Sequence, residues 1–372
     1  MPITGNTLGL YIHVPFCIKK CPYCHFYSTK HTDEKEKAYL NAIISHIAIY
    51  KNFLEKSQII SVYFGGGTPS LLKVETIEKI LSKLPIKKDI EITLEINPED
   101  IGYDKIKSYK ALGINRISIG VQSFDDKILS VLQRRHSSQK AIDVIFDCHN
   151  ADIQNISIDL MYDIMHQDLS SWKANFEKIK DLPITHLSLY NLIFEKNTPF
   201  YRKIEKLNAF LPDEKTSLAF LNYALKFLKN LDFKRYEISA FAKKGFNSIH
   251  NSIYWEGKHF LGFGPSAFSY LDGKRFKNFS SLEKYVLEIQ KGNFIEFEEK
   301  LSYPSNINEL LVINLRLIKG VNIKSFEKKF GKIPLKNLEI LKNSIFVKFT
   351  KNKISLNKKG LLFYDYLAQE II

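Results

Sequence analysis

The chain is poor in cysteine and has no long apolar run, and each of these absences excludes a class of protein. Four cysteines in 372 residues are too few for a disulfide-stabilised secreted domain. No run of 18 apolar residues occurs, so the sequence predicts no transmembrane helix. Residues 1–6 lack the pattern of a signal peptide. Together these absences favour a reduced, cytoplasmic protein, and a hydrophobic content of 45% suffices for an ordinary core.

Arginine is also scarce, because only seven of the 54 basic residues are arginine and lysine supplies the rest. The formal net charge is +14, and basic proteins often meet nucleic acid, anionic membranes or acidic proteins. Scattered lysines are more often a solvated surface than a binding site. The composition therefore disfavours nucleic acid as a partner, while peripheral membrane contact stays open.

Three of the four cysteines, Cys17, Cys21 and Cys24, lie within eight residues in the spacing C-x3-C-x2-C. Thiolates this close can hold three corners of a cubane iron–sulfur cluster, and the fourth iron then stays open to a small molecule. Zinc is the alternative, with His13 or His25 completing a tetrad. Zinc sites usually show two separated ligand pairs, and no second pair exists here. The spacing favours the iron–sulfur cluster.

Apolar, β-rich segments alternate with helical stretches through the first two thirds of the chain. The predicted strands cover residues 8–14, 59–64, 90–96, 116–121, 156–162 and 186–193. Predicted helices include residues 34–56, 74–84, 138–150 and 170–180. This alternation is typical of parallel strands joined by right-handed crossovers. The sequence predicts an α/β fold with a partial (β/α)6 barrel over residues 1–230.

Small and polar residues follow several of these strands. The cysteine loop follows the first strand and the glycine-rich segment 65–70 the second, while Glu95, Gln122 and Asp159 lie at the ends of the next three. In β/α barrels the C-terminal strand ends carry the functional site, so we expect one shared pocket. The glycines match neither a Walker A loop nor G-x-G-x-x-G. They could form only a tight turn, but their place at the cysteine end favours a ligand-binding loop.

Beyond about residue 209 the strand–helix rhythm changes. We expect residues 231–300 to form an accessory aromatic and glycine-rich loop segment on the barrel, with one short strand over 235–239. Residues 301–372 are predicted to form a small winged-helix-like α+β domain with helices 309–317, 324–330 and 359–371 and a hairpin within 345–356. This last segment has 13 basic and five acidic residues, which is +8 of the net charge.

Several motifs in combination resemble those of radical S-adenosylmethionine (SAM) proteins. They are C-x3-C-x2-C, YIHVPFC over 11–17, GGGTPS over 65–70, EINP over 95–98 and IGVQSF over 119–124. The subgroup they resemble contains the oxygen-independent coproporphyrinogen III oxidases and their relatives, the heme chaperones. The resemblance runs from about Leu8 to the C-terminus.

The resemblance implies a role for each matching residue. Cys17, Cys21 and Cys24 would hold a [4Fe-4S] cluster, and SAM would bind its open iron. The residues implied to contact SAM are Tyr11, Tyr23, Gly66, Gly67, Thr68, Glu95, Gln122, Arg134 and Asp159. Carboxylates suit a sulfonium cation that carries ribose hydroxyls. If SAM is cleaved, an acidic electron donor such as flavodoxin or ferredoxin is implied as a partner.

Two features distinguish the branches of this subgroup. The oxidases carry a further cysteine where this chain has Phe26, and they have a longer arm before the cluster than the 16 residues preceding Cys17. The motif His250-Asn251-x-x-Tyr254 resembles the heme chaperone branch, and a histidine with a neighbouring tyrosine suits heme iron. The alternative is that His250 only hydrogen-bonds a loop.

The interpretation favoured by the sequence is therefore a heme chaperone that delivers heme to acceptor proteins. The alternative is an oxygen-independent coproporphyrinogen III oxidase. A minor alternative is a radical enzyme that grips nucleic acid through the lysine-rich C-terminal segment. His25, where an acid is common, and residues 163–167, where a glycine-rich turn is common, depart from the subgroup and concern specificity. Cys148 has no partner in the motif and is expected to be structural.

Overall fold

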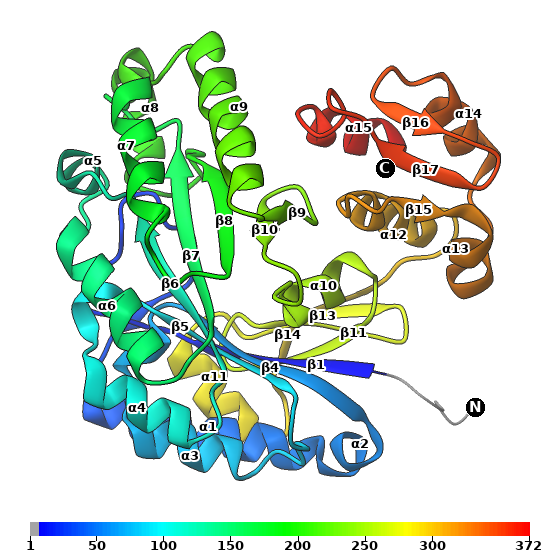
Figure 1. Ribbon diagram of the computed structural model, residues 1–372. Helices are drawn as coiled ribbons and strands as arrows, with labels where there is room; N and C mark the ends of the chain where they lie inside the picture. The colour runs from blue at the N-terminus through cyan, green and yellow to red at the C-terminus, as the bar shows by residue number, and fades with distance from the viewer. Residues whose placement is uncertain (1–6) are drawn as a thin grey trace.

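The computed structural model describes residues 7–372, and its main feature is one mixed sheet of twelve strands (Figure 1). Six neighbouring strands are parallel: β1 (Thr7–Val14), β4 (Gln58–Gly66), β5 (Glu91–Ile96), β6 (Arg116–Gln122), β7 (Asn155–Tyr162) and β8 (His186–Asn191). The six predicted strands of the barrel are confirmed. The sequence predicts no signal peptide from residues 1–6, and these residues lie outside the described part of the chain.

Helices connect these strands and cover the outer face of the sheet (Figure 1). They are α1 (Asp33–Ile49), α2 (Lys51–Lys56), α3 (Val74–Leu81), α4 (Tyr103–Ala111), α5 (Asp126–Val131), α6 (Ser138–Asn150), α7 (Leu169–Ile179), α8 (Ile204–Leu207) and α9 (Glu214–Asn230). Thr32, Ser137 and Asp168 cap three of them by accepting a backbone N–H, as N-cap residues do. The single helix predicted over 34–56 is two helices, because Tyr50 leaves helical geometry.

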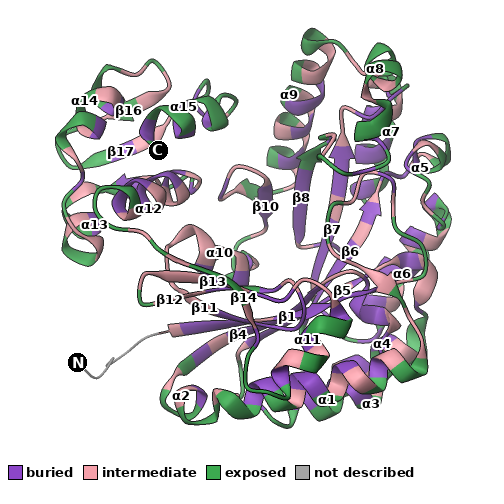
Figure 2. Cartoon of the chain, turned by 180° about the vertical axis from the view of Figure 1, so that it is seen from behind, coloured by how far each residue is buried: buried purple, intermediate pink, exposed green. Residues whose placement is uncertain are grey.

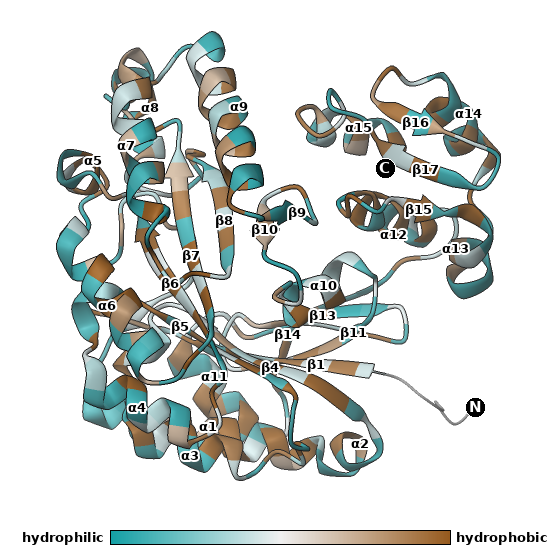
Figure 3. Cartoon of the chain, viewed as in Figure 1, coloured by the Kyte–Doolittle hydropathy of each residue, from teal (hydrophilic) through white to brown (hydrophobic). Residues whose placement is uncertain are grey.

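The sheet does not close on itself. At one side β1 pairs in parallel with β11 (His259–Phe263), and at the other β8 pairs antiparallel with β10 (Ala240–Ala242). The barrel is therefore open, as predicted. Parallel strands covered on both faces read as continuous apolar runs, and the parallel strands are largely buried and apolar in Figures 2 and 3. No helix within residues 7–372 has the length and apolar character needed to cross a membrane.

The loop region expected within residues 231–300 is wrong, because the segment folds into regular elements, while its role as an accessory segment stays a prediction. The segment contains α10 (Ile249–Trp255), α11 (Leu282–Ile289) and, after β11, three antiparallel strands that extend the sheet: β12 (Phe268–Leu271), β13 (Lys274–Asn278) and β14 (Ile295–Lys300). The strand expected over 235–239 is wrong: only Arg235 lies in a strand, β9 (Lys234–Arg235), and residues 236–239 lead back into β10, which pairs antiparallel with β9. These elements are short, so their periodicity is weak in the sequence.

The C-terminal residues form a second apolar core of their own. Its elements are α12 (Ser305–Leu315), β15 (Val321–Asn322), α13 (Ile323–Phe330), α14 (Leu335–Asn343), β16 (Val347–Phe349), β17 (Lys353–Leu356) and α15 (Tyr364–Ile371). The three strands form a separate sheet in the order β15-β17-β16, and Figure 1 shows this group beside α10. The predicted helices and hairpin are present, with α14 as an additional helix, and the winged-helix-like arrangement stays a prediction. The domain boundaries at 230 and 300 stay predictions.

Candidate functional site

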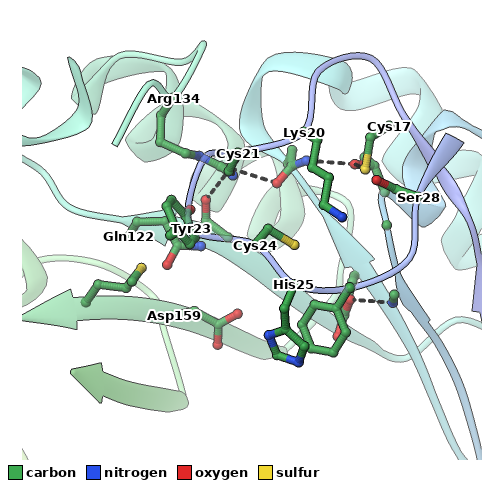
Figure 4. A pocket seen from close by; sticks show the side chains of 18 of the residues that line it. Cys17, Lys20, Cys21, Tyr23, Cys24, His25, Ser28, Gln122, Arg134 and Asp159 are labelled. Carbon is green, nitrogen blue, oxygen red and sulfur yellow. Dashed lines mark hydrogen bonds between the residues drawn. The ribbon is translucent and has the colours of Figure 1, made fainter. Parts of the chain in front are cut away.

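A pocket of about 500 Å³ lies at the C-terminal ends of the parallel strands (Figure 4). Eleven of the twelve residues that the resemblance assigned to the cluster and to SAM line it: Cys17, Cys21, Tyr23, Cys24, Gly66, Gly67, Thr68, Glu95, Gln122, Arg134 and Asp159. They come from the loops or ends of five different strands, as expected for this end of a β/α fold. Tyr11, His250 and Tyr254 are not among the lining residues.

The cysteines lie on a short loop that a two-stranded ladder closes. β2 (Phe16–Cys17) pairs with β3 (Thr29–Lys30), and the Cys24 amide donates to the Cys21 carbonyl at 3.1 Å. All three thiols are free and partly exposed to the pocket. Burial raises the pKa of the Cys17 and Cys24 thiols, so a bound metal is needed to favour their thiolates at neutral pH.

The arrangement of these thiols suits a group wider than a single ion. Within residues 7–372 no three His, Cys, Asp or Glu side chains are close enough to hold one metal ion. A cubane cluster offers a separate iron to each thiolate, so its ligands need not converge on one point. The donor set and its spread around the pocket wall therefore fit an iron–sulfur cluster and disfavour the zinc alternative.

A chain of hydrogen bonds joins Cys17 to Cys21 through three side chains from different strand ends. Thr68 Oγ1 donates to Cys17 Sγ at 3.6 Å, and Asn97 Nδ2 donates to Thr68 Oγ1 at 3.0 Å. Arg134 donates from Nη2 to Asn97 Oδ1 at 2.7 Å and from Nη1 to Cys21 Sγ at 3.4 Å. We call these three residues the cysteine belt. Asn97 has no role among those that the resemblance implies, although its place two residues after Glu95 was a usable signal.

Two carboxyl groups lie at the floor of the pocket. The Tyr63 hydroxyl donates to Glu95 Oε1 at 2.7 Å, and the Gly66 amide donates to Oε2 at 3.2 Å. Burial raises the pKa of Glu95 to about 7 and that of Asp159 to about 6. A cationic ligand favours the ionised form of such groups. Tyr11 packs behind them, with its ring centroid 6.2 Å from that of Tyr63.

The glycines after β4 are required by the backbone as well as by any ligand. Gly66 has φ +110, and a Cβ there would come within 2.5 Å of the His13 ring. A Cβ on Gly67 would come within 2.6 Å of the Phe16 carbonyl oxygen. The close approach of this turn to the end of β1 therefore explains both glycines without a ligand. A substitution at Gly66 would test folding before it tests SAM binding.

The His250–Tyr254 motif lies on α10 in the core, behind the carboxyl pair. The side chain of His250 is fully buried, and both ring nitrogens are engaged: Nδ1 with Ser61 Oγ at 2.9 Å and Nε2 with the Tyr254 hydroxyl at 2.8 Å. Its ring stacks on Tyr63 with 4.9 Å between centroids. Burial lowers the pKa of His250 to about 3, so the ring is neutral. The arrangement matches the alternative in which this histidine hydrogen-bonds its neighbours.

Exposed apolar side chains lie at the mouth of the pocket, together with the cationic Lys19, Lys20 and Arg135. The rings of His25 and Phe26 stack at 4.5 Å between centroids, and Phe26 is 51% exposed. Ile193, another lining residue, is 55% exposed. The divergent turn after Asp159 places Asp163 and His166 at positive φ, a conformation that glycines would adopt more easily.

Comparison with known proteins agrees with the geometry. The Radical SAM superfamily pattern matches residues 11–179. The chain is 33% identical over 324 residues to the heme chaperone HemW of Lactococcus lactis, covering 86% of this chain and 84% of that protein. It is 32% identical over 373 residues to the heme chaperone HemW of Buchnera aphidicola from Schizaphis graminum, covering 97% of each. Coproporphyrinogen III oxidase (HemN) from Escherichia coli has a TM-score of 0.85 at 22% identity, covering 98% of this chain and 90% of that one, so the fold is shared.

Proposed function

Because the chain belongs to the heme chaperone HemW family within the radical SAM superfamily, we propose that it binds heme and delivers it to acceptor proteins. The observation that carries this proposal is the match of 97% of the chain to a protein named as a heme chaperone. Phe26, in the position of the additional oxidase cysteine, supports the same choice. The likeness to the oxidase structure concerns the fold and does not assign its activity to this chain.

The pocket residues fit the cofactors that the superfamily implies. Cys17, Cys21 and Cys24 would hold the [4Fe-4S] cluster, and the cysteine belt would fix the orientation of two of these ligands. SAM bound at the open iron supplies a sulfonium that can be cleaved by one electron. Glu95 and Asp159 would accept hydrogen bonds from its hydroxyls and stabilise its positive charge.

The heme ligand proposed from the sequence is His250, with Tyr254 beside it. Iron coordination needs a free ring nitrogen, whereas both nitrogens are hydrogen-bonded in this structure. Ligation therefore requires α10 to move away from Ser61 or the Tyr254 side chain to turn. The proposal is testable because either movement breaks a specific hydrogen bond.

Heme titration followed by absorbance tests the proposed function. The wild type is expected to bind one heme, and His250→Ala is expected to weaken binding while Tyr254→Phe, which frees Nε2, is expected to preserve or tighten it. If both variants bind heme as tightly as the wild type, the chaperone function is retained but His250 is rejected as the heme ligand. No heme binding by the wild type would reject the function.

Further partners are proposed from charge and redox chemistry. Lys19, Lys20 and Arg135 line the mouth of the pocket, so an acidic flavodoxin or ferredoxin would be steered to the cluster if SAM is cleaved. The association rate should then fall steeply with added salt. The free thiols needed for the cluster suit a reducing compartment such as the cytoplasm.

A further inference from the structure

A second pocket, of about 460 Å³, lies where the end of α10 meets the C-terminal domain. We call it the junction pocket. Its lining includes three lysines, Lys319, Lys329 and Lys353, and one carboxylate, Glu256. It shares no lining residue with the pocket over the cysteines. Its side chains thus carry an excess of positive charge that the site described above does not use.

Each carboxylate oxygen of Glu256 is paired with a lysine. Its Oε1 accepts from Lys319 Nζ at 2.6 Å, and its Oε2 from Lys258 Nζ at 2.7 Å. Burial alone would raise the pKa of Glu256, but these two lysines outweigh burial and hold the pKa below its usual value. Lys329 Nζ donates to the Glu256 backbone carbonyl at 3.0 Å and lies 4.4 Å from the centre of the Phe330 ring. Within residues 7–372, Lys329 and Lys353 have no carboxylate within 4 Å.

The positive charge at Lys329 is crowded. Burial lowers its pKa, and the neighbouring Lys258 lowers it further. A bound anion would relieve this repulsion, because an opposite charge favours the protonated lysine. Lysine ammonium groups are common partners of carboxylate and phosphate.

Apolar side chains lie beside these charges, and Lys329 Nζ is 4.4 Å from the centre of the Phe330 ring. Val321 and Phe326 are buried, and the rings of Phe326 and Phe330 lie 5.0 Å apart between centroids. A pocket that holds lysine ammonium groups next to aromatic rings suits a ligand that has both an anionic group and an apolar body.

We propose that the junction pocket is a second ligand site, which binds an amphipathic anion through its carboxylate or phosphate group. For heme this group is a propionate, an assignment that rests on the proposed function. Glu256 caps the C-terminal end of α10, the helix that carries His250 and Tyr254. An incoming anion competes with Glu256 for Lys319, so binding here loosens the end of that helix.

Calorimetry with the full chain at low salt tests the site, using pyrophosphate, hemin and hemin with both propionates esterified. Lys319→Ala/Lys329→Ala should bind pyrophosphate and hemin on the order of tenfold more weakly. Lys319→Arg/Lys329→Arg should retain affinity, and so should the matched control Lys87→Ala/Lys88→Ala, at an exposed pair outside the pocket. Circular dichroism establishes that each variant is folded.

The outcomes separate the site from the proposed function. Propionate binding here is supported if the wild type binds esterified hemin weakly and the Lys319→Ala/Lys329→Ala variant binds hemin more weakly than the wild type does. Pyrophosphate binding that needs the lysines, while hemin binding ignores them or is absent, keeps the anion site and rejects heme as its ligand. Wild-type protein that binds no anion, or an alanine pair that binds pyrophosphate normally, overturns the site.

Discussion

The pocket over the cysteines and the His250–Tyr254 motif lie on either side of Tyr63 and are built in opposite ways. Tyr63 donates to Glu95 on the pocket side and stacks on His250 on the other. The pocket presents free thiols and carboxyls to an open volume. The motif instead pairs its own polar atoms inside the core. A recognisable motif can thus stabilise the core behind a site, and it need not contact a ligand.

The largest expected effect is loss of the cluster. Cys17→Ala, Cys21→Ala and Cys24→Ala should each abolish most iron incorporation in anaerobically reconstituted protein, because no further cysteine lies nearby to replace the lost ligand. Cys148→Ala, in the buried face of α6, is the matched control and should keep about four irons per chain, as a cubane requires. Iron content that is unchanged in the first three variants would contradict the assignment.

The buried hydrogen bonds of His250 predict that its replacement destabilises the protein. His250→Ala removes two buried hydrogen bonds and a stacked ring, and we expect it to lower the free energy of unfolding by about 2–4 kcal/mol. His149→Ala, at an exposed histidine, is the control and should have little effect. Urea denaturation measures both. A His250→Ala protein as stable as the wild type would show that the motif does not support the core.

The cysteine belt predicts a smaller, local effect. Asn97→Ala leaves Thr68 and Arg134 without one partner each, which should lower the free energy of unfolding by about 1–3 kcal/mol and loosen two cluster ligands. Cluster loss during dialysis, followed by absorbance, should be faster than in the wild type. The exposed Asn293→Ala is the control. Equal rates in both variants would mean that the belt does not hold the cysteines.

The smallest expected effect is a pH dependence. The pKa of Glu95 is raised to about 7 in the folded chain, so its proton is lost between about pH 6 and 8, and SAM affinity should rise over that range by up to about tenfold. The apo protein should lose stability as pH rises from about 4.5 to 7, because the unfolded chain releases this proton first. Glu95→Gln should reduce both slopes, leaving the contribution of Asp159 near pH 6. Identical pH profiles in wild type and variant would show that Glu95 is not the group that titrates.

The strongly patterned parts of the chain could be predicted, and the weakly patterned parts could not. The six parallel strands are long and apolar, and the rule that strand ends share a pocket brings together residues as distant as Cys17 and Asp159. Helix α10 and strand β11 are short and rich in aromatics, so their hydrophobic residues show no clear period. The burial of His250 depends on Ser61, 189 residues away, and no local pattern reports such a contact.

The junction pocket could not be predicted for a similar reason. Its lysines come from α13 and from the segments around β15 and β17, and they lie together only once the C-terminal segment is folded, with Glu256 at the end of α10 beside them. In the sequence they are indistinguishable from the many solvated lysines. The sequence shows the net positive charge of residues 301–372, but it does not show that three of the lysines gather at the junction pocket.

The central claim is that this chain carries heme and does not make its precursor. The most direct measurement supplies cluster-loaded protein with coproporphyrinogen III, SAM and a reductant under anaerobic conditions, and in parallel with heme and an apo heme protein. The account predicts no protoporphyrinogen IX and no CO2 in the first reaction, and transfer of heme to the acceptor in the second. Formation of protoporphyrinogen IX with release of CO2, without heme transfer, would contradict it.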